Sequence, residues 1–294
     1  MSDTRTTAEP PTVPGPARTG GTEDRSAVHQ RLIRARRARR IRTIGTMWAM
    51  RVGVVVLLLG VWEAAHAFEW MNPVFISDPR SVAESLVDMI RSGDLWADGW
   101  ATLKAAMLGL LIGGSGGIIG GLVLAEFPTF REAVRPIVTL ANALPRPALA
   151  PIFLVWFGLG IGSKVAVAVS IVFFLLLINT LAGVDGVDSD RAMLSRTLRM
   201  SRLQRFRLLQ LPTAGPSIIA GLRLGAVYSV LGAVVAEMVA STDGLGLRLV
   251  RAANSFDIAG SFAILFVLAL LAYALDWVIG QVERRLSWQV RAAD

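Results

Sequence analysis

Residues 184–212, VDGVDSDRAMLSRTLRMSRLQRFRLLQLP, form the stretch that decides the fold of this chain. Its acids cluster at the start, where the free amides and the positive dipole end of a helix favour negative charge. Apolar residues then recur at spacings of three to five among six arginines. The pattern predicts one or two short amphipathic helices that stop at Leu211-Pro212, because proline disrupts a helix interior. The acids are Asp185, Asp188 and Asp190; the apolar positions are Leu194, Leu198, Leu203, Phe206 and Leu209; the arginines are Arg191, Arg196, Arg199, Arg202, Arg205 and Arg207.

This stretch lies between two long apolar runs and carries too many charges to span a membrane itself. The positive-inside rule places so arginine-rich a loop in the cytoplasm. A short amphipathic helix pair in that position predicts a docking surface for a soluble partner. Attachment of the arginines to anionic lipid is the alternative.

The composition indicates an all-α polytopic membrane protein. Hydrophobic residues make up 53% of the 294 residues and charged residues 18%, and the mean hydropathy is +0.55, too apolar for an ordinary soluble domain. The net charge of +8 comes mainly from arginines in loops and in the N-terminal tail, as membrane topology requires, so we do not expect nucleic-acid binding. With no cysteine, and with His29 and His66 far apart, no metal site is expected.

Residues 1–45 are expected to form a disordered, arginine-rich cytoplasmic tail. Residues 1–26 hold almost no large apolar side chains and cannot offset the entropy of ordering. Residues 29–45 either lie on anionic lipid as an amphipathic helix or, as we favour, act as a simple topology signal.

The first span is residues 46–68. Ala65-His66-Ala67 resembles a signal-peptidase site, but the long polar leader favours a retained anchor over a cleaved signal. Residues 69–99 are acidic and contain one short helix signal, and we expect them outside the membrane. The second span, residues 101–125, carries a stripe of glycines that predicts close packing against another helix. These helix-packing positions are Gly113, Gly117 and Gly121, with Gly109 in the same register.

The third span, residues 134–158, is interrupted by Pro145, Pro147 and Pro151, and Arg146 places a permanent charge near the membrane interior. Broken backbone at membrane depth is tolerated only where protein or an aqueous cavity satisfies it. An intramembrane arginine is a functional-site candidate. Contact with solute and a structural role for Arg146 are equally consistent with the sequence.

Three more apolar runs, residues 165–183, 214–240 and 259–281, complete six spans with both termini in the cytoplasm. Asn179 in the fourth span either faces solute or, as we favour, bonds a neighbouring helix. Tyr228 and Glu237 are the polar candidates of the fifth span.

These features resemble the binding-protein-dependent permease subunits of bacterial ABC importers, most closely the nitrate/sulfonate/taurine-type branch. That family has a cytoplasmic loop of the form E-A-A, three residues, G, nine residues, I, one residue, L-P. Here Leu211-Pro212 match its end and Leu209 takes the isoleucine position, which places Arg199 at the glycine and Met193-Leu194-Ser195 at E-A-A. The chain departs from the family at the Glu and at the Gly, and arginine adopts a left-handed conformation less readily than glycine.

The resemblance covers most of residues 75–285, including NALPRPALAPIFLVWFGLG, LPTAGPSIIAGLRLG and VVAEMVASTDGLG in family order. It implies a type I importer permease in the bacterial plasma (inner) membrane, with a permease core at residues 100–285, coupling helices at 185–212 and a short cytoplasmic tail at 286–294. It implies as partners a second permease copy, a dimer of ATPase subunits holding ATP and Mg, and an extracytoplasmic solute-binding protein. The implied ATPase-coupling residues are Met193, Leu194, Ser195, Leu198, Arg199, Arg202, Leu203, Phe206, Leu209, Leu211 and Pro212.

The solute path is expected to involve Asn142, Pro145, Arg146, Asn179, Tyr228 and Glu237. A positive residue there suits an anionic solute such as a sulfonate, nitrate, taurine or an aromatic carboxylate. The chain carries no phosphate-binding GxxxxGK[ST], so we expect no cofactor on it and any ATP hydrolysis on another chain.

Two other classes of protein compete with this interpretation. A stand-alone carrier or channel needs no cytoplasmic docking helix and often shows internal repeats. A membrane enzyme needs convergent catalytic groups, for which only Glu63 and Glu237 are available within the spans.

Overall fold

The computed structural model describes residues 22–68 and 77–291, with side chains over residues 45–68 and 77–285. Helices account for every regular element in these ranges. The chain divides into two units, residues 1–64 and residues 65–294.

Helix α1 (Thr22–Ala67) makes up most of the first unit and contains the first span, Gly45–Ala67. It begins inside the segment expected to be disordered, so that expectation is wrong for residues 22–45. The physical reason is local, because this segment is rich in arginine and also contains alanine, and both residues favour helix. The remainder of the expected tail, residues 1–21, lies outside the described residues.

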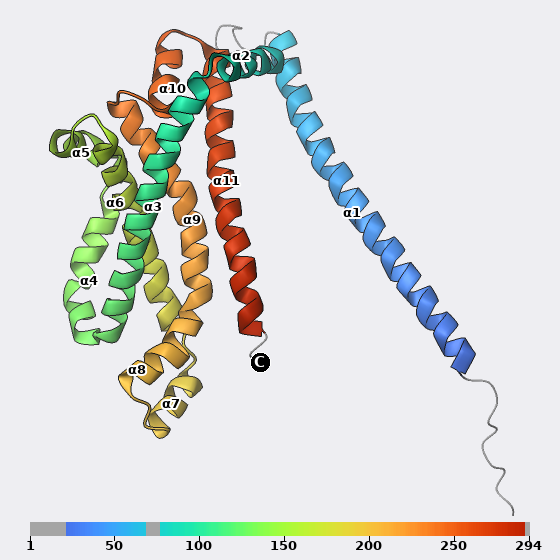
Figure 1. Cartoon of the computed structure of the whole chain (residues 1–294), viewed down its shortest axis with the longest axis vertical. Helices are drawn as coiled ribbons and strands as arrows, with labels where there is room; N and C mark the ends of the chain where they lie inside the picture. Colours follow the sequence, from blue (N-terminus) through green and yellow to red (C-terminus); the bar gives the residue numbers. More distant parts are fainter. Residues whose placement is uncertain (1–21, 69–76, 292–294) are drawn as a thin grey trace, which may run out of the picture. The chain divides into compact units, whose positions relative to one another are not determined.

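The second unit is built around four long helices, which Figure 1 shows side by side with the shorter ones. Helix α3 (Asp94–Glu126) packs along α6 (Ile161–Asp185), α6 packs along α9 (Leu211–Val239), and α11 (Ile258–Arg291) packs against α9. Helix α10 (Leu245–Asn254) covers one end of this bundle. Because α11 continues to Arg291, most of the expected tail at residues 286–294 is helical.

The glycine stripe of α3 faces α6 of the same chain. A β-carbon on Gly117 would lie 2.8 Å from the Leu176 β-carbon and would also meet the Phe173 carbonyl oxygen. A β-carbon on Gly121 would lie 2.7 Å from that of Thr180. Only glycine lets the two backbones approach this closely, so the predicted helix-packing role is assigned to the α3–α6 contact.

Helix α2 (Pro79–Ser92) is the short helix expected within residues 69–99. Asp78 caps it by accepting a 3.0 Å bond from the Ser81 amide, and the bonds from Ser81 hold the pKa of Asp78 below its ordinary value. Gly93, at φ +81°, ends the helix in the left-handed region. Helix α3 then starts at Asp94, so the helix of the second span is longer than the apolar run at residues 101–125. Residues 69–76 lie outside the described residues.

The third span is two helices rather than one. Helix α4 (Pro128–Ala143) is followed by a 3-10 turn (Arg146–Leu149) and by α5 (Ala150–Phe157), with an 83° bend. Pro145 and Pro147 stand at this bend, where each removes a backbone donor. Five helices in the described ranges are long and apolar enough to cross a membrane, and the bent pair makes a sixth span.

Candidate functional site

The arginine-rich stretch forms two short helices, as predicted. Helix α7 (Ser189–Thr197) begins after Asp188, whose side chain accepts a 2.7 Å bond from the Asp190 amide. Helix α8 (Arg202–Arg205) begins with a capping box, in which the Ser201 amide donates to Gln204 Oε1 at 2.8 Å and the Gln204 amide donates to Ser201 Oγ. Both starts are therefore specified by neighbouring residues in the sequence.

The turn between the two helices places Arg199 at φ +49°. This is the position at which the permease loop described above carries glycine. The Arg199 amide donates to the Arg196 carbonyl and the Met200 amide donates to the Ser195 carbonyl, each at 3.0 Å. The turn thus keeps the left-handed conformation that glycine would adopt freely, although an arginine occupies it.

The end of the stretch differs from the prediction. The chain continues from α8 through a π-helical turn (Phe206–Gln210) directly into α9, so no helix stops at Leu211-Pro212. Pro212 falls in the first turn of α9, where proline is tolerated because no backbone hydrogen bond is needed from its position.

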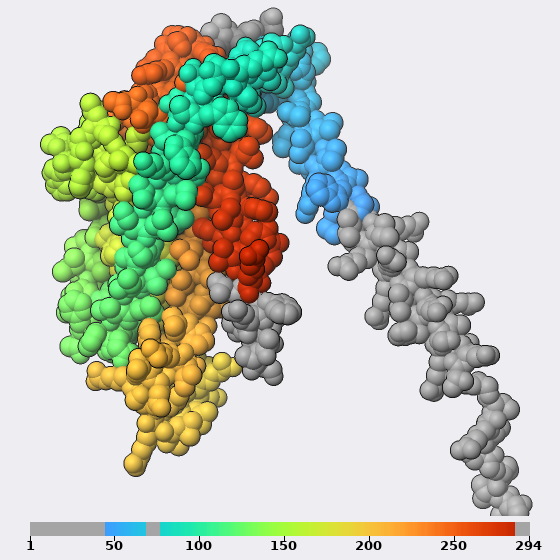
Figure 2. All heavy atoms as spheres, viewed as in Figure 1, coloured from blue at the N-terminus to red at the C-terminus, as the bar shows by residue number. Residues whose placement is uncertain are grey.

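Large apolar side chains of α7 are exposed on this helix pair, which protrudes beyond the spans (Figure 2). Met193 is 70% exposed, Leu194 57% and Leu198 64%. Leu203, Leu211 and Pro212 are also exposed, as are Arg199 and Arg202, whereas Leu209 is half-buried and Ser195 is buried. The predicted coupling set is therefore divided: α7 presents an apolar surface, and Ser195 faces the interior.

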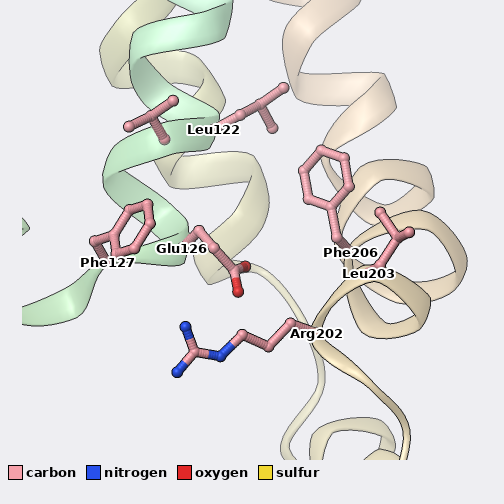
Figure 3. Close-up of a pocket in the computed structure, with 7 residues that line it drawn as sticks. Leu122, Glu126, Phe127, Arg202, Leu203 and Phe206 are labelled. Carbon is pink, nitrogen blue, oxygen red and sulfur yellow. The ribbon is translucent and has the colours of Figure 1, made fainter.

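A pocket of about 430 Å³ lies between α8 and the end of α3 (Figure 3). Its α3 side is made by Leu122, Val123, Glu126 and Phe127, and its other side by Arg202, Leu203 and Phe206. The half-buried Phe206 ring and part of Leu203 thus line a pocket of their own chain. Sequence reasoning missed Glu126, although a carboxylate ending an apolar span was a visible signal.

The bend of the third span brings together three of the expected path residues. Arg146 donates from Nη2 to the Ala141 carbonyl at 2.9 Å and to Asn142 Oδ1 at 3.1 Å. Its guanidinium carbon lies 4.4 Å from the centroid of the Phe174 ring. Pro145 directly precedes it. Arg146 is therefore half-buried and held in place by α4 and α6, with its positive charge at the corner of the broken span.

The other expected path residues lie apart from this corner. Asn179 donates to the Leu175 carbonyl at 2.8 Å, and a β-carbon on Gly221 would lie 3.0 Å from its β-carbon, so Asn179 sits in the α6–α9 contact. Tyr228 is exposed on α9.

Glu237 is fully buried and already bonded, which corrects its assignment to the solute path. Its Oε1 lies 3.2 Å from Lys164 Nζ, and Thr102 Oγ1 donates to its carboxylate at 2.9 Å. The Gly246 amide donates to Oε2 at 2.9 Å, and Lys164 also pairs with Asp243. This network ties α3, α6, α9 and α10 together, and an ion pair so thoroughly bonded has no free acceptor for a solute.

Comparison with known proteins identifies the family of this architecture. The family model "Binding-protein-dependent transport system inner membrane component" matches residues 102–288. The chain is 30% identical over 243 residues to the taurine transport system permease protein TauC of Escherichia coli (strain K12), covering 81% of this chain and 88% of that protein. It is 32% identical over 236 residues to the riboflavin transport system permease protein RibX of Chloroflexus aurantiacus, covering 80% and 88%.

Solved structures show the same fold. The MetNI methionine ABC transporter in an inward-facing conformation matches with a TM-score of 0.58 and 16% identity, covering 65% of this chain and 96% of that chain. A bacterial ABC transporter that imports alginate matches with a TM-score of 0.57 and 16% identity, covering 85% and 99%. From the extent of the family match and the identity to its relatives, the chain belongs to the binding-protein-dependent transport system inner membrane components, the multi-pass permease subunits of ABC importers.

Proposed function

We propose that residues 190–211 dock an ATPase subunit and thereby couple ATP hydrolysis, which takes place on that partner, to solute movement through this chain. The observation that carries the proposal is the exposed apolar surface of Met193, Leu194 and Leu198 on a helix pair that protrudes beyond the spans. Soluble surfaces rarely leave such side chains together unless a partner covers them. The arginines of the same stretch would contact acidic positions at the rim of the partner's groove.

The full assembly in this proposal contains two permease copies, two ATPase subunits that hold ATP and Mg, and an extracytoplasmic solute-binding protein. Both termini and α7 would lie in the cytoplasm, and α2 and α10 at the opposite end would face the binding protein. Alternating access follows if closing of the ATPase dimer moves the docked helices together. This requires the docked states to differ in contact free energy. A helix pair whose ends are capped can carry the movement of the ATPase subunits to the spans.

The docking surface is tested with Met193→Asp and Leu198→Asp. Each would place an unpaired carboxylate in the partner's groove, and we expect a loss of about 2–5 kcal/mol of docking free energy. The measurements are copurification of the ATPase subunit and solute uptake. Because both side chains are exposed, the permease itself should fold normally.

The matched control is Arg196→Gln, which removes a charge from the same helix and keeps its apolar surface. Lipid attachment depends mainly on total charge, so under that alternative Arg196→Gln should matter as much as the leucine substitution. If Leu198→Asp keeps both the partner and uptake, the docking proposal fails, and a stand-alone carrier or channel becomes the better interpretation.

For the solute, we propose a small anion, with a sulfonate as the first candidate. The support is the fixed charge of Arg146 at the bend of the third span. Relatives named for taurine and aliphatic sulfonate transport agree with it, while those named for riboflavin and formylaminopyrimidine keep the range of solutes open.

Arg146→Gln is expected to lower uptake of the anion while the complex stays assembled, because the guanidinium charge is lost and the α4–α5 bend retains its prolines. The measurement is uptake of a radiolabelled aliphatic sulfonate in vesicles. Arg135→Gln, on the exposed face of α4, is the control and should transport normally. Normal transport by Arg146→Glu would contradict an electrostatic role.

A further inference from the structure

The corner at which α3 ends and α4 begins faces both sides of the proposed docking stretch, residues 190–211. Arg131, in the first turns of α4, forms a two-point ion pair with Asp185, the last residue of α6 before α7. The two contacts are 2.7 Å from Nη1 to Oδ1 and 2.5 Å from Nη2 to Oδ2. This fork geometry is specific in direction as well as strong, so one flank of the stretch is firmly held to the corner.

The other flank approaches the same corner without closing on it. Arg205 of α8 places Nη2 at 3.9 Å from Oε1 of Glu126, the last residue of α3. That separation is about 1 Å too long for a charge-assisted hydrogen bond. Both carboxylate oxygens of Glu126, and Nε of Arg205, are buried with no hydrogen-bond partner among the described residues. Buried polar groups left in this way raise the free energy of the arrangement and favour any state that pairs them.

Helix α8 lies between two irregular backbone segments. On one side is Arg199, held at φ +49°, and on the other is the π-helical turn Phe206–Gln210. Left-handed non-glycine residues store strain, and π-turns inside helices often mark functional sites. The pocket between α8 and α3 supplies the space, and its walls are mainly the apolar side chains of Leu122, Val123, Phe127, Leu203 and Phe206 (Figure 3).

We propose that α8 closes onto α3 through an ion pair between Glu126 and Arg205, which makes Glu126 the positioning residue that passes movement of the docking stretch to the α3–α4 corner. This rests on the proposed docking function and identifies where its motion enters the spans. Helix α4 then leads from the corner directly to the bend that carries Arg146. Closing also buries the apolar walls of the pocket against each other, which favours the same movement.

The first test uses three variants in the purified complex with the ATPase subunit. Two are the single variants Glu126→Gln and Arg205→Gln. The third is a charge swap that combines Glu126→Arg and Arg205→Glu in one chain. Three quantities are measured: bound ATPase, ATP hydrolysis, and solute uptake per ATP hydrolysed. We expect the single variants to keep the ATPase but to lose about tenfold in uptake per ATP, within the usual range for coupling between sites. The swap should recover most of that loss, and Arg135→Gln, on the exposed face of α4 and outside residues 190–211, should behave as the wild type.

An unchanged ratio in both single variants, or a swap no better than either of them, would overturn the proposal. Loss of the ATPase subunit from the single variants would also overturn it, because the pair would then belong to docking itself. Failure of the proposed docking function would be seen in other samples: the wild-type chain would not copurify with the ATPase subunit, or Met193→Asp would still copurify with it. The two failures are therefore distinguishable.

A second measurement does not depend on removing either charge. The chain has no cysteine, so the pair Val123→Cys with Leu203→Cys, from opposite walls of the pocket, reports closure by disulfide cross-linking. We expect a higher cross-linking yield in the ATP-bound complex than in the nucleotide-free complex. Equal yields in the two states would show that α8 does not close and would refute the proposal.

Discussion

Arg199, in the turn between α7 and α8, occupies a strained backbone conformation. Its φ of +49° costs a non-glycine residue roughly 1–2 kcal/mol relative to a right-handed conformation. The turn between α7 and α8 keeps this conformation because the two capped helices and the backbone bonds to Arg196 and Ser195 determine it from both sides. The family pattern predicts the position of the turn, and the arginine adds strain without changing its geometry.

Replacing Arg199 with glycine should relieve this strain. We expect Arg199→Gly to raise the free energy of unfolding of the stretch by about 1 kcal/mol, partly offset by the greater freedom of glycine in the unfolded chain. The measurement is thermal unfolding of the purified permease, together with ATPase copurification. Arg196→Gly, at a helical position of α7, is the control and should lower stability by about 0.5–1 kcal/mol. Equal destabilisation by both variants would be incompatible with strain at Arg199.

At the scale of elements, the α3–α6 pair forms the scaffold on which the site is built. The stripe of Gly113, Gly117 and Gly121 lets the two backbones approach, and the buried Lys164–Glu237 pair ties α6 to α9 at the opposite end from α7. Breaking such a buried pair by removing one partner typically costs about 3–5 kcal/mol, because the other charge is left uncompensated.

The stripe makes a direct prediction for Gly117→Leu. A β-carbon at this position already meets the Phe173 carbonyl oxygen and Leu176, so a leucine must force α3 and α6 apart. We expect the variant to lose about 1–3 kcal/mol of stability and to assemble poorly. The measurement is the yield and melting temperature of the detergent-solubilised complex. Ser115→Leu, on the exposed side of α3, should be tolerated; normal behaviour of Gly117→Leu would contradict the packing described here.

At the scale of the whole molecule, the arrangement of charges separates the two ends of the second unit. The α7 end carries the arginines of the docking stretch, whereas α2 and the start of α3 at the other end carry Asp78, Asp94 and Asp98. Arg248 of α10 lies at the same end, where its positive charge is neutralised by Asp98 at 2.7 Å. This asymmetry favours placing the α7 end in the cytoplasm.

Single-cysteine labelling in this cysteine-free chain tests the orientation. We expect Ser201→Cys, exposed between α7 and α8, to be protected from an impermeant thiol reagent in intact cells and to react after the cells are opened. Ser92→Cys, exposed at the end of α2, should react from outside and serves as the matched control. Labelling of Ser201→Cys from outside intact cells would rule out the proposed topology.

The sequence by itself determined the features that depend on local order. Hydropathy located the spans, the glycine spacing predicted a close helix contact, and the acids and arginines located the two short helices between the spans. Two helix boundaries that the sequence did not predict also have local causes. Helix α1 extends back to Thr22 because a helix tolerates many arginines. Helix α8 continues into α9 because a helix tolerates a proline in its first turn. These boundaries are the least certain part of any sequence-based prediction.

Only the tertiary structure decided which side chains face each other. Glu237 meets Lys164, 73 residues earlier in the chain, and so became a buried partner instead of a path residue. Phe206 turns to the end of α3, and Glu126 there faces Arg205. The physical reason is that periodicity defines the faces of one helix but carries no information on which neighbour covers each face. That choice comes from the packing of the α3, α6 and α9 backbones, whose contacts join residues far apart in the sequence.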